Sequence, residues 1–339
     1  MPSSRLSSEK NSRKTIGRWL TLGCIGIAAY FISKDLANQW PLVGEVTRSQ
    51  SLFKLGIALV GSCISISFSG LSLCFFYQGF VTKGEVLRPR LVGTYMVANL
   101  FRYVPGKVST IIYLVQGSGL SKMPMTQATA TMLASSILIG TSCAVVLTSS
   151  LPDFGIATVT LIPVLLFCGL IFVPKVHHTV LTLVQKKFGH RLSIEPGSFH
   201  PFPIAIGFGV LLIGWLFASC SLVILIQQTV ALTPRDMILT LPLFPAAATA
   251  GFLVLTAPAG IGVREAVIVA FLTQMFTWSE GADAQRAAAF SLALLHRFVV
   301  TLSDLAMGGI GMLLQKGSER FQAAHRATGE RAIPKSFKD

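Results

Sequence analysis

A short break, residues 257–265, interrupts a long apolar stretch of the chain between residues 237 and 278. Its sequence, Ala-Pro-Ala-Gly-Ile-Gly-Val-Arg-Glu, contains a proline and two glycines, which the interior of a helix disfavours. In lipid, an unpaired backbone group costs several kcal/mol, so broken backbone persists only inside the protein or beside a water-filled cavity. The segment therefore predicts a re-entrant tip inside the protein. A turn outside the membrane stays open, because residues 266–278 are too few to cross a bilayer of roughly 20 helical residues.

A second break lies in the first half of the chain, at residues 99–108. Pro105 and Gly106 interrupt an apolar run there, and the basic residues Arg102 and Lys107 flank them. A pair of interrupted hydrophobic segments, one in each half of the chain, is the sequence feature that best indicates a transporter binding site. We therefore expect the two breaks to contribute to one site.

The composition requires a membrane environment. Hydrophobic residues make up 52 % of the 339 residues and charged residues only 12 %, whereas soluble domains have about 25 % charged residues. The apolar runs are far longer than barrel strands, so the expected fold class is all-α, a polytopic helical membrane protein. The longest polar segment, residues 175–203, is too short for a separate catalytic domain.

The net charge of +14 does not indicate a nucleic-acid partner. The basic residues gather at the ends of apolar runs and in both tails, as the positive-inside rule predicts for cytoplasmic loops. All six cysteines lie in apolar runs without metal-ligand spacing, and the adjacent pair His177 and His178 lacks the i,i+4 spacing of a helical metal site. We expect neither a metal nor a cofactor.

Six uninterrupted apolar runs are long enough to cross the membrane. They are residues 16–32, 52–77, 125–150, 154–173, 204–231 and 287–314. With both breaks re-entrant, each half has three crossings, so the halves form an inverted repeat. The basic loops then place both termini in the cytoplasm and the protein in the cytoplasmic (inner) cell membrane. A cleaved signal peptide is the alternative for residues 16–32.

This topology gives one transmembrane domain with two tails. Residues 1–15 are expected to be a disordered cytoplasmic tail and residues 315–339 a basic cytoplasmic tail. The domain itself spans residues 16–314, with a first half at 16–150 and a second half at 154–314.

The last expected crossing carries His296, Arg297 and Asp304. Arg297, Thr301 and Asp304 follow the spacing i, i+4, i+7 and so share one face of a helix. Charged residues at membrane depth are rare and usually functional. Two interpretations stay open: a structural Arg-Asp hydrogen-bond pair between helices, or the wall of a cavity that accompanies a headgroup or relays protons.

The breaks offer chemistry for an anion. Gly260 and Gly262 lead into a helix whose free N–H groups and positive dipole end suit a phosphate. Arg264 adds a planar fork of donors, and Glu265 could hold Arg264 or another cation in place. Motifs for nucleophilic hydrolysis, zinc proteolysis or nucleotide binding are missing from the sequence, so we do not expect an enzyme.

At these residues the chain resembles the transmembrane domain of lysylphosphatidylglycerol synthases and related flippase-like integral membrane proteins. The resemblance rests on three places: Asn99 with Arg102-Tyr103-Val104-Pro105-Gly106-Lys107, Pro258-Ala259-Gly260-Ile261-Gly262-Val263-Arg264-Glu265-Ala266, and Arg297. It covers roughly residues 17–314. Ser109 and Ala259 stand where the family often has glycine. The resemblance implies re-entrant segments around a lipid-translocating cavity; the soluble aminoacyltransferase or glycosyltransferase domain of other members does not fit in this chain.

The resulting hypothesis is a lipid flippase that moves a phospholipid or a polyprenyl-phosphate-linked glycolipid. The phosphate would engage Arg264, the amides of residues 260–263, Arg102 and Lys107, with Arg297 along its path and proton coupling through His296, Glu265 or Asp304. The full set of candidate substrate-binding residues is Arg102, Pro105, Gly106, Lys107, Pro258, Gly260, Gly262, Arg264, Glu265, His296, Arg297 and Asp304.

Three other functions stay open at this point. The chain could be an ion-coupled transporter of a small soluble anion, or an intramembrane transferase acting on a lipid-linked sugar. It could also be an accessory subunit of lipid-linked glycan synthesis that recruits a lipid- or glycan-modifying enzyme. The expected partners are membrane lipids or a lipid-linked glycan, with no nucleic acid.

Overall fold

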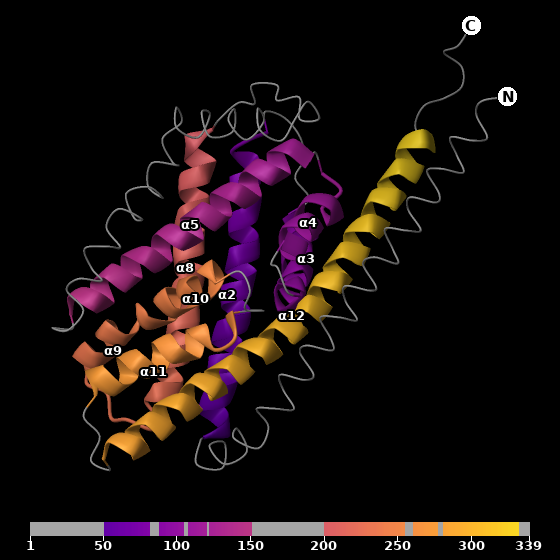
Figure 1. The fold of residues 1–339 in the computed structure, drawn as a ribbon. Helices are drawn as coiled ribbons and strands as arrows, with labels where there is room; N and C mark the ends of the chain where they lie inside the picture. The colour runs from indigo at the N-terminus through magenta and orange to yellow at the C-terminus, as the bar shows by residue number, and fades with distance from the viewer. Residues whose placement is uncertain are drawn as a thin grey trace, which may run out of the picture.

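The computed structural model describes residues 51–81, 88–104, 108–120, 122–150, 200–254, 260–276 and 281–331. The expected crossings at residues 16–32 and 154–173 lie outside these ranges, as does the expected tail at 1–15. The described residues form helices and no strand, which confirms the all-α fold (Figure 1). The helices are α2 (Leu52–Gln78), α3 (Arg88–Leu100), η1 (Phe101–Tyr103), α4 (Val108–Gly117), α5 (Lys122–Ser149), α8 (Pro201–Ile226), α9 (Pro234–Thr240), α10 (Leu243–Leu253), α11 (Val263–Met275) and α12 (Ala282–Arg331).

The described part of the chain contains five helical stretches that are long and apolar enough to cross a membrane. They are Leu52–Gln78, Pro124–Ser149, Pro201–Ile226, Pro234–Leu253 and Ala282–Arg320. The protein is therefore a membrane-embedded helical protein. The fourth stretch combines α9 and α10. The next helix, α11, packs beside α10, so the chain reverses direction after this stretch.

Helices α2 and α8 form an antiparallel pair through the centre of the molecule. At one end the Ser51 amide donates to the Gln228 side chain, and at the other the His200 amide donates to the Gly79 carbonyl. Between them, Gly61 lies so close to α8 that an added Cβ would be 3.4 Å from the Phe217 carbonyl oxygen. Small residues allow this close approach of helices in lipid.

Both predicted breaks are present, and each separates the two arms of a helical hairpin. In the first hairpin, η1 ends α3 and the chain returns as α4, with the Phe101 and Tyr113 rings stacked 4.6 Å apart. In the second, α10 ends at Leu253 and α11 begins at Val263. Figure 1 shows α3 beside α4 and α10 beside α11. Beside the first break Phe101 and Tyr103 are buried; at the second break Gly260 is buried, whereas Leu253, Val254 and Ile261 are exposed.

Helix α12 joins the two hairpins. It runs antiparallel to α3, with Gly311 packed on Gly93 and Gly308 on Leu100, and antiparallel to α11, where Gln285 donates to the Thr273 carbonyl. The helix has 50 residues, about 75 Å at 1.5 Å per residue, far more than the roughly 30 Å core of a bilayer. It continues as one helix through Arg331, whereas the predicted crossing ended at residue 314.

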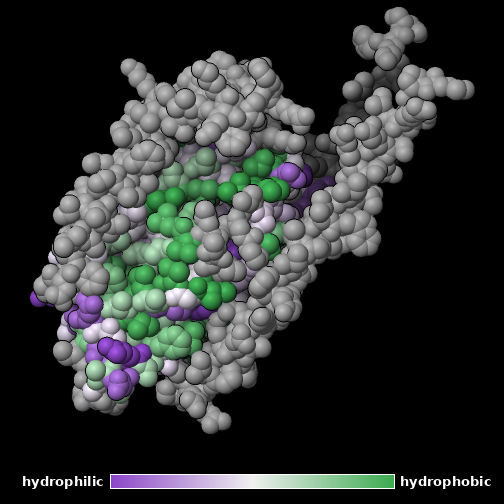
Figure 2. All heavy atoms as spheres, in the orientation of Figure 1, coloured by the Kyte–Doolittle hydropathy of each residue, from purple (hydrophilic) through white to green (hydrophobic). Residues whose placement is uncertain are grey.

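Two hydrophobic clusters pack on either side of the molecular centre. One joins α8, α10, α11 and α12, and the other joins α2, α3 and α5 with the start of α8. Trp215 and Cys143 pack against both clusters, so they mark the plane between them. The face seen in Figure 2 is hydrophobic over α5 and α10.

Candidate functional site

The polar stripe of α12 ties each break to the same helix. Arg297 donates from Nη1 to the Glu265 Oε1 at 2.6 Å, which fixes the start of α11. Two turns further along, Asp304 accepts hydrogen bonds from Arg102 and, at 2.7 Å, from the Tyr103 hydroxyl, which fixes η1. A structural Arg-Asp pair between helices, one of the two open interpretations, is therefore present, but its arginine is Arg102, and Arg297 pairs with Glu265 instead.

The tip of the second hairpin requires its glycines. Gly260 and Gly262 have φ angles of 73° and 83°, values that residues with a side chain rarely adopt. Gly260 also packs on Gly251, where an added Cβ would lie 2.8 Å from the Gly251 Cα. The Glu265 Oε2 accepts from the Gly262 amide at 2.7 Å, so one amide of the predicted anion cradle already has a carboxylate partner. This correction leaves Arg264 as the main anion ligand at this tip.

Arg264 is 9 % exposed and has no carboxylate partner among the described residues. Its neighbour Glu265 is held by Arg297, and its guanidinium lies over the Phe244 ring, 5.1 Å from the centroid. Its stem passes Gly251, where an added Cβ would be 2.6 Å from the Arg264 Cγ. A cation–π contact offsets only part of the cost of burying this charge. The position therefore favours a bound anion.

The balance of charges leads to the same conclusion. In the described part of this cluster, three arginines (Arg102, Arg264 and Arg297) face two carboxylates (Glu265 and Asp304), which leaves one positive charge in excess. Placing an arginine at the centre of a membrane helix costs about 2.5–3.5 kcal/mol on insertion scales, so an unbalanced one indicates function.

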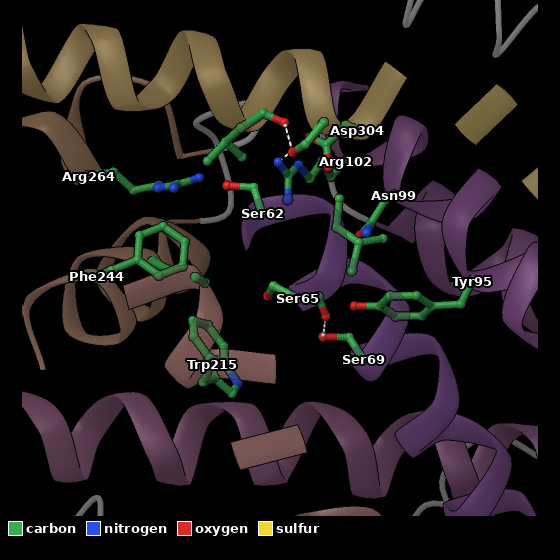
Figure 3. A pocket seen from close by; sticks show the side chains of 15 residues that line it. Ser62, Ser65, Ser69, Tyr95, Asn99, Arg102, Trp215, Phe244, Arg264 and Asp304 are labelled. Carbon is green, nitrogen blue, oxygen red and sulfur yellow. Dashed lines mark hydrogen bonds and ion pairs between the residues drawn. The ribbon is translucent and has the colours of Figure 1, made fainter. Parts of the chain in front are cut away.

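Two adjoining cavities open onto these arginines, and both are lined by Tyr95, Asn99, Arg102, Trp215, Ala248 and Arg264. The polar chamber, of about 130 Å³, also has Ser62, Ser65, Ser69, Phe244, Ser303 and Asp304 in its wall. The apolar chamber, of about 230 Å³, is completed mainly by α4, α5 and α10, including Ile111, Leu114, Met132, Leu133, Ile137 and Phe252. In Figure 3, Arg264 reaches across the polar chamber toward Arg102 and Asp304.

Several buried donors in the chamber walls have no hydrogen-bond partner among the described residues. They are the Arg102 Nε, the Trp215 Nε1 and the Thr110 Oγ1. A buried donor without a partner costs about 1–3 kcal/mol, so such groups at a cavity indicate a ligand or water that supplies acceptors. Together with Arg264, they describe a site for an anion with several oxygen atoms.

The predicted candidates separate into three groups. Arg102, Arg264 and Asp304 line the chambers. Glu265, Arg297, Gly260 and Gly262 line neither chamber and instead build the second hairpin and its link to α12. Arg297 was expected to lie along the cavity wall, and it does not. Pro105, Gly106, Lys107 and Pro258 lie outside the described residues.

His296 occupies a different position from the expected one. It is buried, lines neither chamber and packs edge-on against Phe244, with ring centroids 5.0 Å apart. Phe244 in turn carries the Arg264 guanidinium on its ring. His296 thus supports the platform beneath Arg264, and the geometry gives no argument for direct contact with substrate.

The sequence analysis missed the serines of α2 as lining residues. Gly61 and Gly70 pack against neighbouring helices, whereas Ser62, Ser65 and Ser69 line the polar chamber. Their spacing, i, i+3 and i+7, places them on one helical face and was the available signal. Tyr95, Trp215 and Phe244 gave no such signal, because an aromatic residue in an apolar run is usually a core residue.

No protein-family model matches the chain, and no curated protein matches it.

Proposed function

We propose that this protein is a lipid flippase that moves an anionic lipid, a phospholipid or a polyprenyl-phosphate-linked glycolipid, across the cytoplasmic membrane. The observation that carries the proposal is Arg264: a buried arginine without a carboxylate partner among the described residues, at the junction of a polar and an apolar chamber. The lipid phosphate would lie between Arg264 and Arg102, and the first part of the chain would lie in the apolar chamber.

The resemblance to the flippase-like transmembrane domain of lysylphosphatidylglycerol synthases supports this proposal. Its motif residues Arg102 and Arg264 come together at the same chambers, although 162 positions (264 − 102) separate them in sequence. The proposal includes the topology expected from the basic loops, with both termini in the cytoplasm.

Movement would depend on the two hairpins, which come from opposite halves of the chain. Each is fixed to α12 by its own ion pair, Glu265 with Arg297 and Arg102 with Asp304. A phosphate at Arg102 competes with the Asp304 carboxylate for the same donors, so substrate binding loosens η1 from α12. Loosening one hairpin while the other stays fixed is a physical route to opening the site toward one side of the membrane.

The chamber walls also bear on the alternative of a small soluble anion. Such a transporter needs the arginines but has no use for a larger apolar chamber lined by Leu114, Met132 and Phe252. A lipid uses both, because its phosphate needs donors and its chain needs apolar surface. This contrast favours the lipid as substrate.

The test is a flipping assay with the purified chain in vesicles. Fluorescent anionic lipid is added at a trace level, and a membrane-impermeant reductant reports the fraction in the outer leaflet over time. We expect the wild type to speed equilibration and Arg264→Ala to return it to the rate of empty vesicles. Equal rates with wild type and with empty vesicles would contradict the proposal, as would uptake of free phosphate in place of lipid movement. The same assay separates a working flippase from an accessory subunit, since no partner is present.

A further inference from the structure

The walls of the polar chamber differ from what a phosphate alone requires. A phosphate offers acceptors, and Arg264, Arg102 and Trp215 supply donors for it. The chamber also presents side-chain hydroxyls: Ser62 of α2 lies beside Arg264 and Arg102, and Ser65 and Ser69 lie farther along α2 toward Tyr95 (Figure 3). Ser303 of α12 and Asn99 of α3 complete this hydroxyl wall. Building on the proposed function, the structure assigns this wall to the headgroup: the polar chamber takes a hydroxylated headgroup, a polyol or sugar phosphate, that carries no ammonium group.

The hydrogen bonds within the wall leave acceptors free. The Ser69 hydroxyl donates to the Ser65 carbonyl at 2.9 Å and also contacts the Tyr95 hydroxyl, which leaves one lone pair on its oxygen. The Ser303 hydroxyl donates to the Val300 carbonyl at 2.7 Å. The Ser221 hydroxyl donates to the Ala58 carbonyl, so Ser62 is the donor in the 3.0 Å contact between Ser62 and Ser221. A hydroxyl that donates to the backbone keeps its oxygen lone pairs. The wall therefore offers acceptors, which require O–H or N–H donors from a ligand.

The charges around the chamber select O–H donors over an ammonium group. Asp304 is the chamber's carboxylate among the described lining residues, and it faces two arginines, Arg102 and Arg264. Its Oδ1 has no partner within the described part of the chain and can accept one hydroxyl. An ammonium group in this chamber would face Arg264 and Arg102 without a carboxylate of its own. Like charges at close range repel, so a zwitterionic amine headgroup is disfavoured.

The position of the chambers gives the order of groups along the lipid. Arg102, Arg264 and Trp215 line both chambers and form their junction, where the phosphate would bind. The headgroup hydroxyls then lie on the serine side, and the hydrocarbon chain lies on the side of Leu114 and Met132. Both ends of one lipid are therefore accommodated without a charge left unpaired.

The test compares three short-chain lipids with identical tails: phosphatidylglycerol, phosphatidic acid and phosphatidylethanolamine. Affinity is measured by titration calorimetry on the full chain in detergent. We expect phosphatidylglycerol to bind about fivefold or more tightly than phosphatidic acid, the factor that corresponds to one net hydrogen bond, and phosphatidylethanolamine to bind most weakly.

A pair of serine variants on α2 provides the control. Ser69→Ala removes a chamber hydroxyl, whereas Ser67→Ala removes a hydroxyl that makes the same kind of backbone contact, at 3.0 Å to the Cys63 carbonyl, but lines neither chamber. Ser69→Ala should abolish the preference for phosphatidylglycerol and leave phosphatidic acid unchanged, and Ser67→Ala should change neither. Equal binding of the two anionic lipids to wild type, or tight binding of phosphatidylethanolamine, overturns this inference while the flippase proposal stands. Binding of no anionic lipid in an Arg264-dependent way overturns the flippase proposal itself.

Discussion

Two buried arginines near the centre of this protein have opposite roles because of their partners. Arg297 is balanced by Glu265 at 2.6 Å, and that pair holds the start of α11 against α12. Arg264, the next residue before Glu265, has only the Phe244 ring beneath it in the described structure and lines both chambers. The same side chain is therefore structural at one position and available to a ligand at the other.

Replacing each arginine by alanine should separate these roles. Arg264→Ala should lower anionic-lipid affinity about 10- to 100-fold, the range for hydrogen bonds to a charged group, with an unchanged or higher thermal unfolding midpoint. Arg264→Lys should restore part of the affinity, because a point charge replaces a two-donor fork. Lipid titration and thermal unfolding in detergent measure both effects.

Arg297→Ala is the matched contrast. It leaves Glu265 buried and unpaired, a change that typically costs 3–5 kcal/mol, so the unfolding midpoint should fall sharply. An Arg264→Ala protein that unfolds as easily as Arg297→Ala would show that Arg264 is structural.

At the scale of elements, glycines at the helix–helix contacts determine how closely the hairpins pack. Gly140 of α5 faces Thr249 of α10 so closely that an added Cβ would overlap the Thr249 hydroxyl. Gly93 and Gly311 bring α3 and α12 into backbone contact in the same way. In a membrane, where water does not drive helices together, such close packing is a main source of association.

Gly140→Ala should destabilise the protein by about 1–3 kcal/mol, the usual cost of overpacking, because neither α5 nor α10 can move away without losing other contacts. Gly209→Ala is the control: it is also in a long helix, but an added Cβ meets nothing within 4 Å. It should be neutral or slightly stabilising. Similar losses for both variants, measured by chemical or thermal unfolding in detergent, would rule out close packing as the cause.

The link between η1 and α12 leads to a second prediction at this scale. Asp304→Asn keeps an acceptor for Arg102 and Tyr103 but removes the charge that competes with substrate phosphate. Anionic lipid should then bind more tightly, by about tenfold. Flipping should slow, because no internal carboxylate displaces the lipid phosphate from Arg102 at the end of the cycle. Affinity and flipping rate are measured on the same preparation. A variant that loses both binding and flipping would indicate that Asp304 only holds the fold together.

Within the described residues the sequence predicted the long helices and the positions of both breaks, but it ended the last helix too early and missed the partners of the charged residues. Breaks at proline and glycine follow from local backbone chemistry, so their positions were correct. The prediction that the polar residues of α12 share one helical face was also correct. Their partners, however, are residues 102 and 265, and no local pattern encodes such long-range pairs. The chamber walls were missed for the same reason: serines and aromatics from separate helices become a site only after the helices pack.

At the scale of the whole molecule, the α2–α8 pair gives a direct test of the proposed orientation. With the termini in the cytoplasm, Ser51 lies at the outer end of the pair and His200 at the inner end. In a cysteine-free background, Ser51→Cys should react with an impermeant maleimide added to intact cells, and His200→Cys should react only after the cells are opened. The reverse pattern would invert the proposed topology.

The central claim is that two hairpins from the two halves of the chain build one phosphate site. The most direct test is a double-mutant cycle on lipid affinity and flipping with Arg102→Lys, Arg264→Lys and the double variant, since lysine keeps both charges and removes both forks. If the arginines share one phosphate, each single variant is costly and the double is little worse than the worse single, a coupling of about 0.5–3 kcal/mol. Independent sites would instead give losses that add to within about 0.3–0.5 kcal/mol, and that result would contradict the single-site mechanism.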